Sequence, residues 1–256
     1  MNVLCDLDGV IYRGRRVITG APDALRRLRD SGIDVFFITN NSTRSPERSA
    51  EKIEAITGFE VDAEQVLGSS LAAVSLLGPD DGPVLAVGEG GVVDAIERAG
   101  LEMAGDPRTA RSVLVGLTRD LSYDLLADAM SAIRSGARFI ATNDDTTFPT
   151  EDDLLPGAGA IVAAIAAATG QEPEVAGKPH RPMRELIRSR GVTDAWVIGD
   201  RVDTDIALAK DEPDWRSILV LTGVTPPSEV ASSGADRVVD DFPAAVDLVL
   251  SESQPS

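Results

Sequence analysis

The chain has 256 residues, an apolar fraction of 43% and a formal net charge of −18. This length suffices for a large hydrophobic core without disulfide bonds, and no apolar run reaches the roughly 18–20 residues of a membrane-spanning helix. The charge argues against nucleic-acid binding, because a phosphate backbone attracts basic surfaces, and any phosphate site must create its own local positive field.

The start of the chain and its cysteine content bear on location. The first residues carry no basic region and reach Asp6 at once, so a signal peptide is not expected. Cys5 is the only cysteine and has no partner for an internal disulfide, which suits a reducing cytoplasm. We therefore expect a cytoplasmic protein with no membrane segment. The acidic excess leaves two interpretations open, an adaptation to high salt and a plain solubility feature.

Strand-like apolar runs alternate with helical patterns along the chain. Residues 3–5 form a short apolar run, residues 21–30 have the pattern of a helix, and residues 33–38 form a second apolar run. Further apolar runs follow at 195–198 and 218–221. This alternation predicts an α/β fold with a doubly wound parallel sheet, in which binding residues gather beyond the carboxyl ends of the strands.

The middle of the chain has strand and helix units of its own. Two stretches rich in turn-forming residues, 78–83 and 170–173, are interpreted as boundaries. Between them the predicted elements lie, in order, at 84–87, 92–99, 113–117, 123–135, 139–142 and 159–168. We therefore predict an inserted α/β module at residues 80–173 and a core formed by residues 1–79 and 174–256.

The residue types present exclude several hydrolytic mechanisms. His180 is the only histidine, so neither a histidine-rich metal site nor a Ser-His-Asp triad is expected. Cys5 lacks the arginine that a cysteine phosphatase loop carries six residues later, because Ile11 stands there. Lys178 precedes Pro179 rather than Ser or Thr, which excludes a nucleotide P-loop. Carboxylates remain as candidate nucleophiles and metal ligands.

Two carboxylates, Asp6 and Asp8, follow the first predicted strand. Residues two apart on an extended chain project to the same side, so the pair can share a Mg²⁺ ion, which prefers oxygen ligands. One carboxylate can attack phosphorus while the other serves as acid and base. The same spacing arises readily by chance in so acidic a chain, as at Asp203 and Asp205.

Three further elements strengthen the interpretation. The run 39–42, Thr-Asn-Asn-Ser, offers a hydroxyl, amides and backbone N–H groups to a phosphate, although these residues are also typical of a turn that caps a helix. Lys178 supplies a cation on a loop restricted by proline. Asp200 and Asp205 follow another predicted strand and add carboxylates for a metal, with an acidic loop that opens a helix as the alternative.

The order of these elements resembles the haloacid dehalogenase (HAD) superfamily of phosphatases, and within it the NagD-type and p-nitrophenylphosphatase-like branch with a type IIA cap. The motifs that carry the resemblance are Asp6-Leu7-Asp8-Gly9-Val10-Ile11-Tyr12-Arg13-Gly14, Thr39-Asn40-Asn41-Ser42, Gly177-Lys178-Pro179, Gly199-Asp200-Arg201, Thr204-Asp205-Ile206, Leu221-Thr222-Gly223-Val224-Thr225 and Pro156-Gly157-x-Gly159. They extend over nearly the whole chain. The resemblance implies a Rossmann-like core that carries the insertion as a cap.

The resemblance also implies roles for single residues. Asp6 would be the nucleophile that forms an aspartyl-phosphate, and Asp8 would protonate the leaving oxygen and then activate water. The remaining roles are those of Mg²⁺ ligands (Asp6, the Asp8 backbone carbonyl and Asp200, with Asp205 supporting the metal waters or Lys178) and of phosphate-binding residues (Thr39, Asn40 and Lys178). This division suits phosphoryl transfer, in which positioning and charge neutralisation dominate.

The expected activity is hydrolysis of small phosphomonoesters, such as sugar, glycerol or related phosphates, and of p-nitrophenyl phosphate in vitro. Two alternatives remain: a phosphotransferase or phosphomutase that uses the same intermediate, and a receiver-type signalling domain that accepts a phosphoryl group. The core motifs bind only phosphate and metal, so the leaving group must be selected elsewhere. We assign this selection to the polar stretch 143–155 of the cap, and within it to Asn143, Asp145 and Phe148.

Three positions depart from the family pattern. Asp144 stands where many relatives have proline, and Phe148 stands where some have histidine. Asp203 adds a carboxylate inside the metal motif and receives no role. Related enzymes are often dimers through the cap, so the resemblance implies a homodimer as a further expectation.

Overall fold

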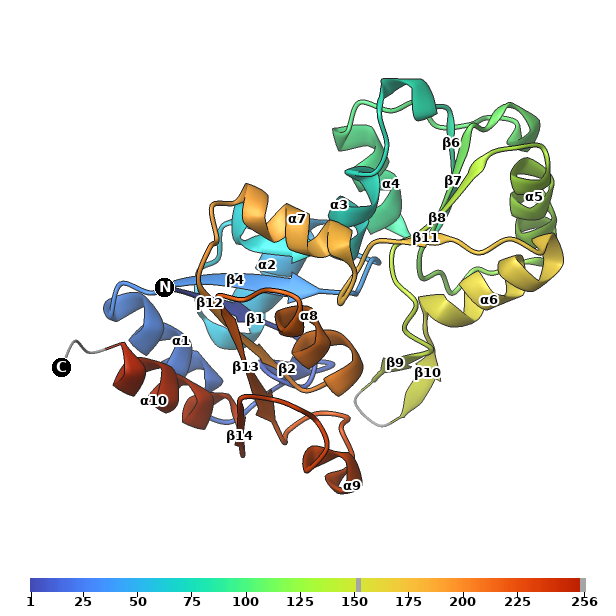
Figure 1. Ribbon diagram of the computed structural model, residues 1–256. Coiled ribbons are helices and arrows are strands. Elements are labelled where there is room, and N and C mark those ends of the chain that lie inside the picture. The colour runs from blue at the N-terminus through green and yellow to red at the C-terminus, as the bar shows by residue number, and fades with distance from the viewer. Residues whose placement is uncertain (151–152, 254–256) are drawn as a thin grey trace.

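The fold contains two parallel sheets flanked by helices, as the computed structural model describes for residues 1–150 and 153–253 (Figure 1). The larger sheet has six strands in the order β14-β13-β12-β1-β4-β5. Their bounds are β1 (Asn2–Cys5), β4 (Asp34–Thr39), β5 (Val66–Gly68), β12 (Ala195–Gly199), β13 (Trp215–Val220) and β14 (Arg237–Val239). Because the chain runs from β1 outward in both directions, the carboxyl edge around β1 is a topological switch point, the usual place for a binding site. The predicted doubly wound α/β fold is confirmed.

Alternate residues of the central strands face opposite sides of this sheet. Val3 and Cys5 belong to one buried cluster and Leu4 to another, and strands buried on both faces give the continuous apolar runs of the sequence. Trp196 of β12 and Trp215 of β13 are likewise divided between the two clusters. The first cluster includes α1 (Ala21–Asp30), α2 (Pro46–Thr57) and α10 (Phe242–Glu252); the second includes α3 (Ser69–Val74), α7 (Arg181–Ser189) and α8 (Ala207–Lys210).

The smaller sheet lies in the middle of the sequence and has the order β11-β8-β7-β6. Its strands are β6 (Val84–Val87), β7 (Ser112–Val115), β8 (Arg138–Ala141) and β11 (Glu174–Val175). One face is covered by α5 (Tyr123–Arg134) and α6 (Ala158–Thr169), and the other face packs on α4 (Gly90–Arg98). That second face shares its buried cluster with α3 and α7, which joins the two sheets through a continuous apolar contact.

The end of the smaller sheet differs from the predicted boundary. Val175 pairs with Ala141 in β8, so the sheet continues past residue 173, where we placed the C-terminal limit of the insertion. The turn-rich stretch 170–173 therefore precedes the last strand of this sheet rather than the return to the larger one. The division into a core and a cap remains a prediction.

The stretch 143–155, predicted as a polar loop, contains part of a β-hairpin. Strand β9 (Thr147–Pro149) pairs antiparallel with β10 (Leu154–Pro156), with Phe148 opposite Leu155. This apolar pair explains why a strand pairing forms here; residues 151–152 lie outside the described part. Figure 1 shows the hairpin extending from the smaller sheet toward the larger one. A second hairpin, β2 (Tyr12–Arg13) and β3 (Arg16–Val17), follows the first strand, and a short helix, α9 (Pro227–Val230), precedes β14.

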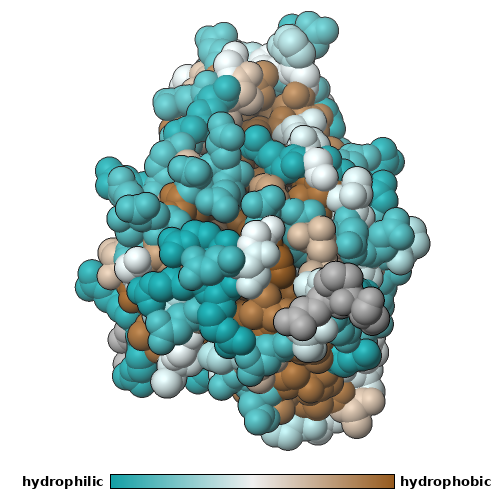
Figure 2. All heavy atoms as spheres, turned by 90° about the vertical axis from the view of Figure 1, so that its left-hand side faces the viewer, coloured by the Kyte–Doolittle hydropathy of each residue, from teal (hydrophilic) through white to brown (hydrophobic). Residues whose placement is uncertain are grey.

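Hydrophobic residues are concentrated in three buried clusters. Figure 2 shows one face of the molecule, on which hydrophilic residues cover most of the surface and hydrophobic residues form separate patches. Among the described residues, none of the helices has the length and apolar character needed to span a membrane.

Candidate active site

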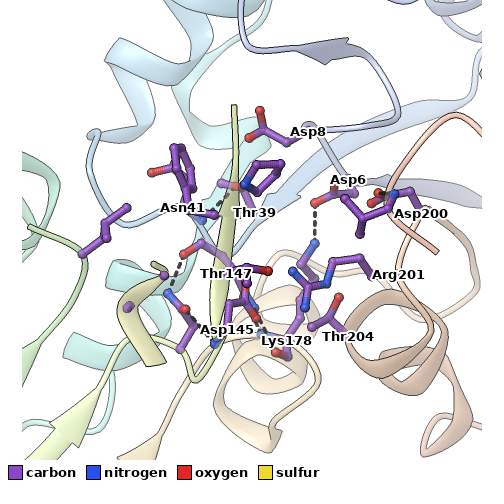
Figure 3. A pocket seen from close by; sticks show the side chains of 18 residues that line it. Asp6, Asp8, Thr39, Asn41, Asp145, Thr147, Lys178, Asp200, Arg201 and Thr204 are labelled. Atoms are coloured by element: carbon purple, nitrogen blue, oxygen red, sulfur yellow. Dashed lines mark hydrogen bonds and ion pairs between the residues drawn. The ribbon is translucent and has the colours of Figure 1, made fainter. Parts of the chain in front are cut away.

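The predicted site residues come together at the carboxyl edge of the larger sheet. Asp6 directly follows β1, Thr39 ends β4 and Asp200 directly follows β12, and these three strands are neighbours in the sheet. Lys178 reaches the same point from the loop after β11 and is only 2% exposed. Figure 3 shows these side chains around one cavity, with Asp145 lying across from Asp6 and Asp200.

Lys178 is held between two carboxylates. Its Nζ lies 2.5 Å from Asp6 Oδ1 and 2.6 Å from Asp205 Oδ1, and it donates a further hydrogen bond to the Ile38 carbonyl at 3.2 Å. Burial alone would lower the pKa of Lys178, but Asp205 and Asp6 raise it above its usual value. The ammonium group is therefore charged. Of the two roles left open for Asp205, the structure brings it into contact with Lys178.

Three buried carboxylates surround the position expected for the metal. Asp6, Asp200 and Asp205 each offer an oxygen, and the three oxygens lie within 4.8 Å of one another. Burial raises the pKa of Asp200 to about 7, with a contribution from Asp205, and burial raises the pKa of Asp6 well above its usual value although Lys178 opposes this. One lysine therefore does not neutralise the group. An all-oxygen, negatively charged set fits a hard cation such as Mg²⁺ or Ca²⁺.

The position of Asp200 depends on two glycines. A Cβ on Gly223 would lie 1.7 Å from Asp200 Oδ2, and one on Gly9, whose φ is +90°, would lie 2.6 Å from the same oxygen. That oxygen also accepts a hydrogen bond from the Val224 N–H at 2.7 Å. The loop after β13 thus packs directly on Asp200, which explains why small residues are needed at both positions.

Asp8 also lines the cavity but is less buried than the three clustered carboxylates. It is half-buried, and none of the described residues forms a hydrogen bond with its carboxylate. Burial raises the pKa of Asp8, while Lys52, Arg44 and Lys178 oppose the shift. A raised pKa moves this carboxyl toward the range in which a general acid operates.

The two phosphate-binding candidates on the loop after β4 differ from each other. The Thr39 hydroxyl oxygen accepts a hydrogen bond from the Asn41 N–H at 3.1 Å, which leaves its own hydrogen for a ligand. The Asn40 amide, by contrast, is already used: Oδ1 accepts from the Lys178 N–H at 2.8 Å, and Nδ2 donates to the Lys178 carbonyl and to Asp145 Oδ1, both at 3.0 Å. The side chain predicted to hold phosphate therefore fixes the Lys178 loop. A phosphate contact through the Asn40 backbone remains a prediction.

The three cap residues have different surroundings. Asn143 is buried, its Nδ2 donates to the Asn40 carbonyl at 2.7 Å and its Oδ1 accepts from the Asp145 N–H at 3.2 Å. Its amide is thus engaged between the two loops, whereas we had assigned Asn143 to selection of the leaving group. Asp145 lines the cavity while contacting Asn40, and Phe148 lines it from β9.

Comparison with known proteins identifies the family. A family described as haloacid dehalogenase-like hydrolase matches residues 3–102, and one described as HAD-hydrolase-like matches residues 175–245. The 5′-nucleotidase YutF of Bacillus subtilis is 38% identical over 229 residues, which are 87% of each chain. The chain belongs to the haloacid dehalogenase-like hydrolase family.

Solved structures of HAD phosphatases match the whole fold. A p-nitrophenyl phosphatase from Archaeoglobus fulgidus has a TM-score of 0.88 and 32% identity, over 96% of this chain and 98% of that one. The glycerol phosphate phosphatase from Mycobacterium tuberculosis, solved in complex with magnesium, has a TM-score of 0.86 and 35% identity, over 94% and 74% of the respective chains. The protein is accordingly a phosphatase of the HAD family, as the motif order predicted.

Arg201 also lines the cavity of this HAD phosphatase, although its sequence pattern predicted no role of its own. Its Nε and Nη2 lie 3.3 and 3.1 Å from the two oxygens of Asp203, which is 71% exposed. Asp203, the carboxylate that received no role in the sequence analysis, therefore orients Arg201 and is not one of the three clustered buried carboxylates. The Arg-x-Asp spacing was the available signal, but it does not say which way the arginine points.

Proposed function

We propose that the protein is a Mg²⁺-dependent phosphomonoesterase that hydrolyses small phosphorylated metabolites through an aspartyl-phosphate on Asp6. The observation that carries this proposal is the buried group at one sheet edge, in which Asp6, Asp200 and Asp205 approach within 4.8 Å and Lys178 contacts two of them. Such a group brings an ammonium, oxygen ligands for a metal and a carboxylate nucleophile together at one point, as phosphoryl transfer requires.

The residues available fit the metal. Asp6, Asp200 and the Asp8 backbone carbonyl would hold Mg²⁺, while Asp205 acts through its contact with Lys178. When bound, the ion supplies positive charge that neutralises the carboxylates and the phosphoryl oxygens. No His or Cys ligand accompanies the described carboxylates, so the site offers nothing that selects Zn²⁺.

The protein's own groups account for both chemical steps. Lys178 contacts one oxygen of Asp6, and we assign the other oxygen as the nucleophile. It forms a bond to phosphorus as the ester P–O bond breaks, and Asp8 gives its proton to the leaving oxygen. Asp8, now a carboxylate, takes a proton from water as that water attacks phosphorus, which releases phosphate and restores Asp6. Thr39 and Lys178 hold the phosphoryl oxygens.

The proposed substrates are sugar, glycerol or related phosphates, with p-nitrophenyl phosphate as a laboratory substrate. Relatives named acid sugar phosphatase, 4-nitrophenylphosphatase and D-glycerol 3-phosphate phosphatase support this range. A receiver-type domain is disfavoured because named phosphatases match along almost the whole chain. Transfer of the phosphoryl group to a sugar hydroxyl has no specific observation in its favour.

The test is phosphate release from a panel of metabolites and p-nitrophenyl phosphate. We expect Mg²⁺ to support turnover, EDTA to abolish it and added Mg²⁺ to restore it, with Zn²⁺ no better as an activator. Full activity after exhaustive metal removal would refute the metal-dependent mechanism. A protein that releases phosphate from none of these esters would refute the phosphomonoesterase itself.

A further inference from the structure

A groove beside the catalytic cavity is rich in positive charge. Five cationic residues are among its described lining residues: Arg15, Arg44, Arg48, Lys52 and Arg119. Among the residues that the structure describes, only two carboxylates line the groove, those of Asp8 and Glu51. The whole chain has 24 basic and 42 acidic residues. The excess of cations in the groove is therefore opposite in sign to the net charge of the molecule. The groove is therefore a local positive field on an acidic protein.

The fold holds these cations in defined positions. Arg48 and Lys52 lie one turn apart on α2, so they share one helix face. Arg44 lies in the loop before α2, which packs on the start of α4: the Gly91 N–H donates to the Thr43 carbonyl at 3.2 Å. A Cβ on Gly91 would lie only 2.5 Å from the Arg44 carbonyl oxygen. The backbone that carries Arg44 is thus clamped by the cap.

Two of the cations have no acidic partner among the residues that the structure describes. Arg48 and Arg119 pair with Glu51 and Glu89, each at 3.1 Å. Within residues 1–150 and 153–253, no carboxylate approaches within 4.0 Å of Lys52 or Arg44. The Lys52 ammonium instead lies 3.7 Å from the centre of the Tyr12 ring. A half-buried ammonium and a guanidinium without a carboxylate are suited to an anionic ligand.

The groove is continuous with the catalytic cavity at the point where the leaving group must pass. Asp8, Phe148 and Pro149 line both spaces. Asp8 is the proposed acid for the leaving oxygen, so that oxygen must lie beside Asp8 when the ester bond breaks. Lys52 and Arg44 line the groove together with Asp8, so their positive charges lie on the same side of the site as the proposed acid. The atoms attached to the leaving oxygen therefore have a direct path into the positive groove.

We propose that the groove is a second anion site, which binds a carboxylate or a second phosphate on the leaving-group part of the substrate. This inference rests on the proposed phosphomonoesterase function and names its substrate class: phosphomonoesters that carry a second oxyanion. The net charge of −18 opposes attraction of such substrates from a distance. Lys52 and Arg44 supply the attraction at short range.

Matched substrate pairs test the proposal. For the carboxylate, phosphoglycolate is compared with 2-hydroxyethyl phosphate; for the second phosphate, 1,3-propanediol bisphosphate is compared with 3-hydroxypropyl phosphate. We expect higher kcat/KM for the member with the second anion in at least one pair. Lys52→Gln and Arg44→Gln should each reduce that preference by about 10- to 100-fold, the range for losing a hydrogen bond to a charged group. Lys52→Arg should retain it.

Lys210→Gln is the matched control, because it removes a lysine on α8 that lines neither space. The ratio of the two kcat/KM values within a substrate pair cancels any effect of the Lys52 substitution on Asp8 itself. The pair that responds identifies carboxylate or phosphate as the second anion. Equal rates within both pairs, or a preference that survives both substitutions, would overturn the second anion site while leaving p-nitrophenyl phosphate hydrolysis intact. Failure to hydrolyse any ester would instead overturn the proposed function.

Discussion

The two sides of the catalytic cavity are built on different principles. On the side of the larger sheet, the buried Lys178 contacts both Asp6 and Asp205, which are also buried. On the side of the smaller sheet, Asn143 and Asp145 contact the Asn40 loop, and Phe148 lies on a hairpin. The first side provides the groups proposed to react, whereas Asn143 and Asp145 on the second side hold the Asn40 loop in place. A polar residue of the predicted cap that lies near the site is therefore not necessarily free to bind substrate.

The largest effect is expected from the two reacting carboxylates. Asp6→Asn should abolish turnover, because an amide neither attacks phosphorus nor binds Mg²⁺ as a carboxylate does. Asp8→Asn should reduce kcat by about 10²- to 10⁴-fold, the range for one general acid or base. Phosphate release from the purified variants measures both.

Asp124→Asn, an exposed change on α5, is the control for loss of a carboxylate and should behave as the parent. Substantial turnover by Asp6→Asn would end its assignment as nucleophile and, with it, the contrast between reacting and supporting sides.

A large effect on stability is expected from Lys178→Gln. The substitution leaves Asp6 and Asp205 as uncompensated buried charges, and breaking a buried pair typically costs about 3–5 kcal/mol. Urea unfolding in EDTA measures the free energy of unfolding without a contribution from bound metal. Lys210→Gln serves as the reference, and equal stability of the two variants would contradict the view that Lys178 compensates the buried charges of Asp6 and Asp205.

Substitutions on the side of the smaller sheet should distinguish a residue that supports the site from one that selects the substrate. Asp145→Ala removes the hydrogen bond to Asn40 and should lower kcat for all substrates by a similar factor, on the order of tenfold. Phe148→Ala alters a surface shared by the cavity and the groove and should change the ranking of substrates. Relative kcat/KM over a panel distinguishes the two.

Asp144→Ala is the neighbouring control, because its carboxylate contacts His180 at 3.2 Å rather than Asn40. A ranking that changes equally in the Asp145 and Phe148 variants would restore the original expectation that both residues select substrate.

The smallest effect concerns the surface rather than the cavity. If the acidic excess is an adaptation to high salt, the melting temperature should continue to rise as KCl approaches 1 M. Screening of exposed carboxylates is nearly complete before that, since the Debye length falls to roughly 3 Å at 1 M. A melting temperature that reaches its plateau below a few tenths molar would favour plain solubility.

The parts predictable from sequence are those fixed by local pattern and strand order. The apolar runs gave β1, β4, β12 and β13, and polar residues at their carboxyl ends had to meet because parallel strands end at one edge. The uses of Asn40 and Asn143 were not predictable, because each has a hydrogen-bond partner that is distant in sequence: Asn40 and Lys178 are 138 residues apart, and Asn143 and Asn40 are 103 residues apart. An amide's partner is decided by tertiary packing. The homodimer and the cytoplasmic location remain predictions.

Both tryptophans of the chain, Trp196 and Trp215, lie in adjacent strands of the larger sheet. Intrinsic fluorescence excited at the indole band therefore reports on that sheet alone, while circular dichroism reports on helices throughout the protein. If the insertion melts separately, the two signals will give different transition temperatures; if the shared apolar cluster couples the sheets, they will coincide. The uneven placement of two indoles thus provides a label-free optical test of whether the cap is an independent folding unit.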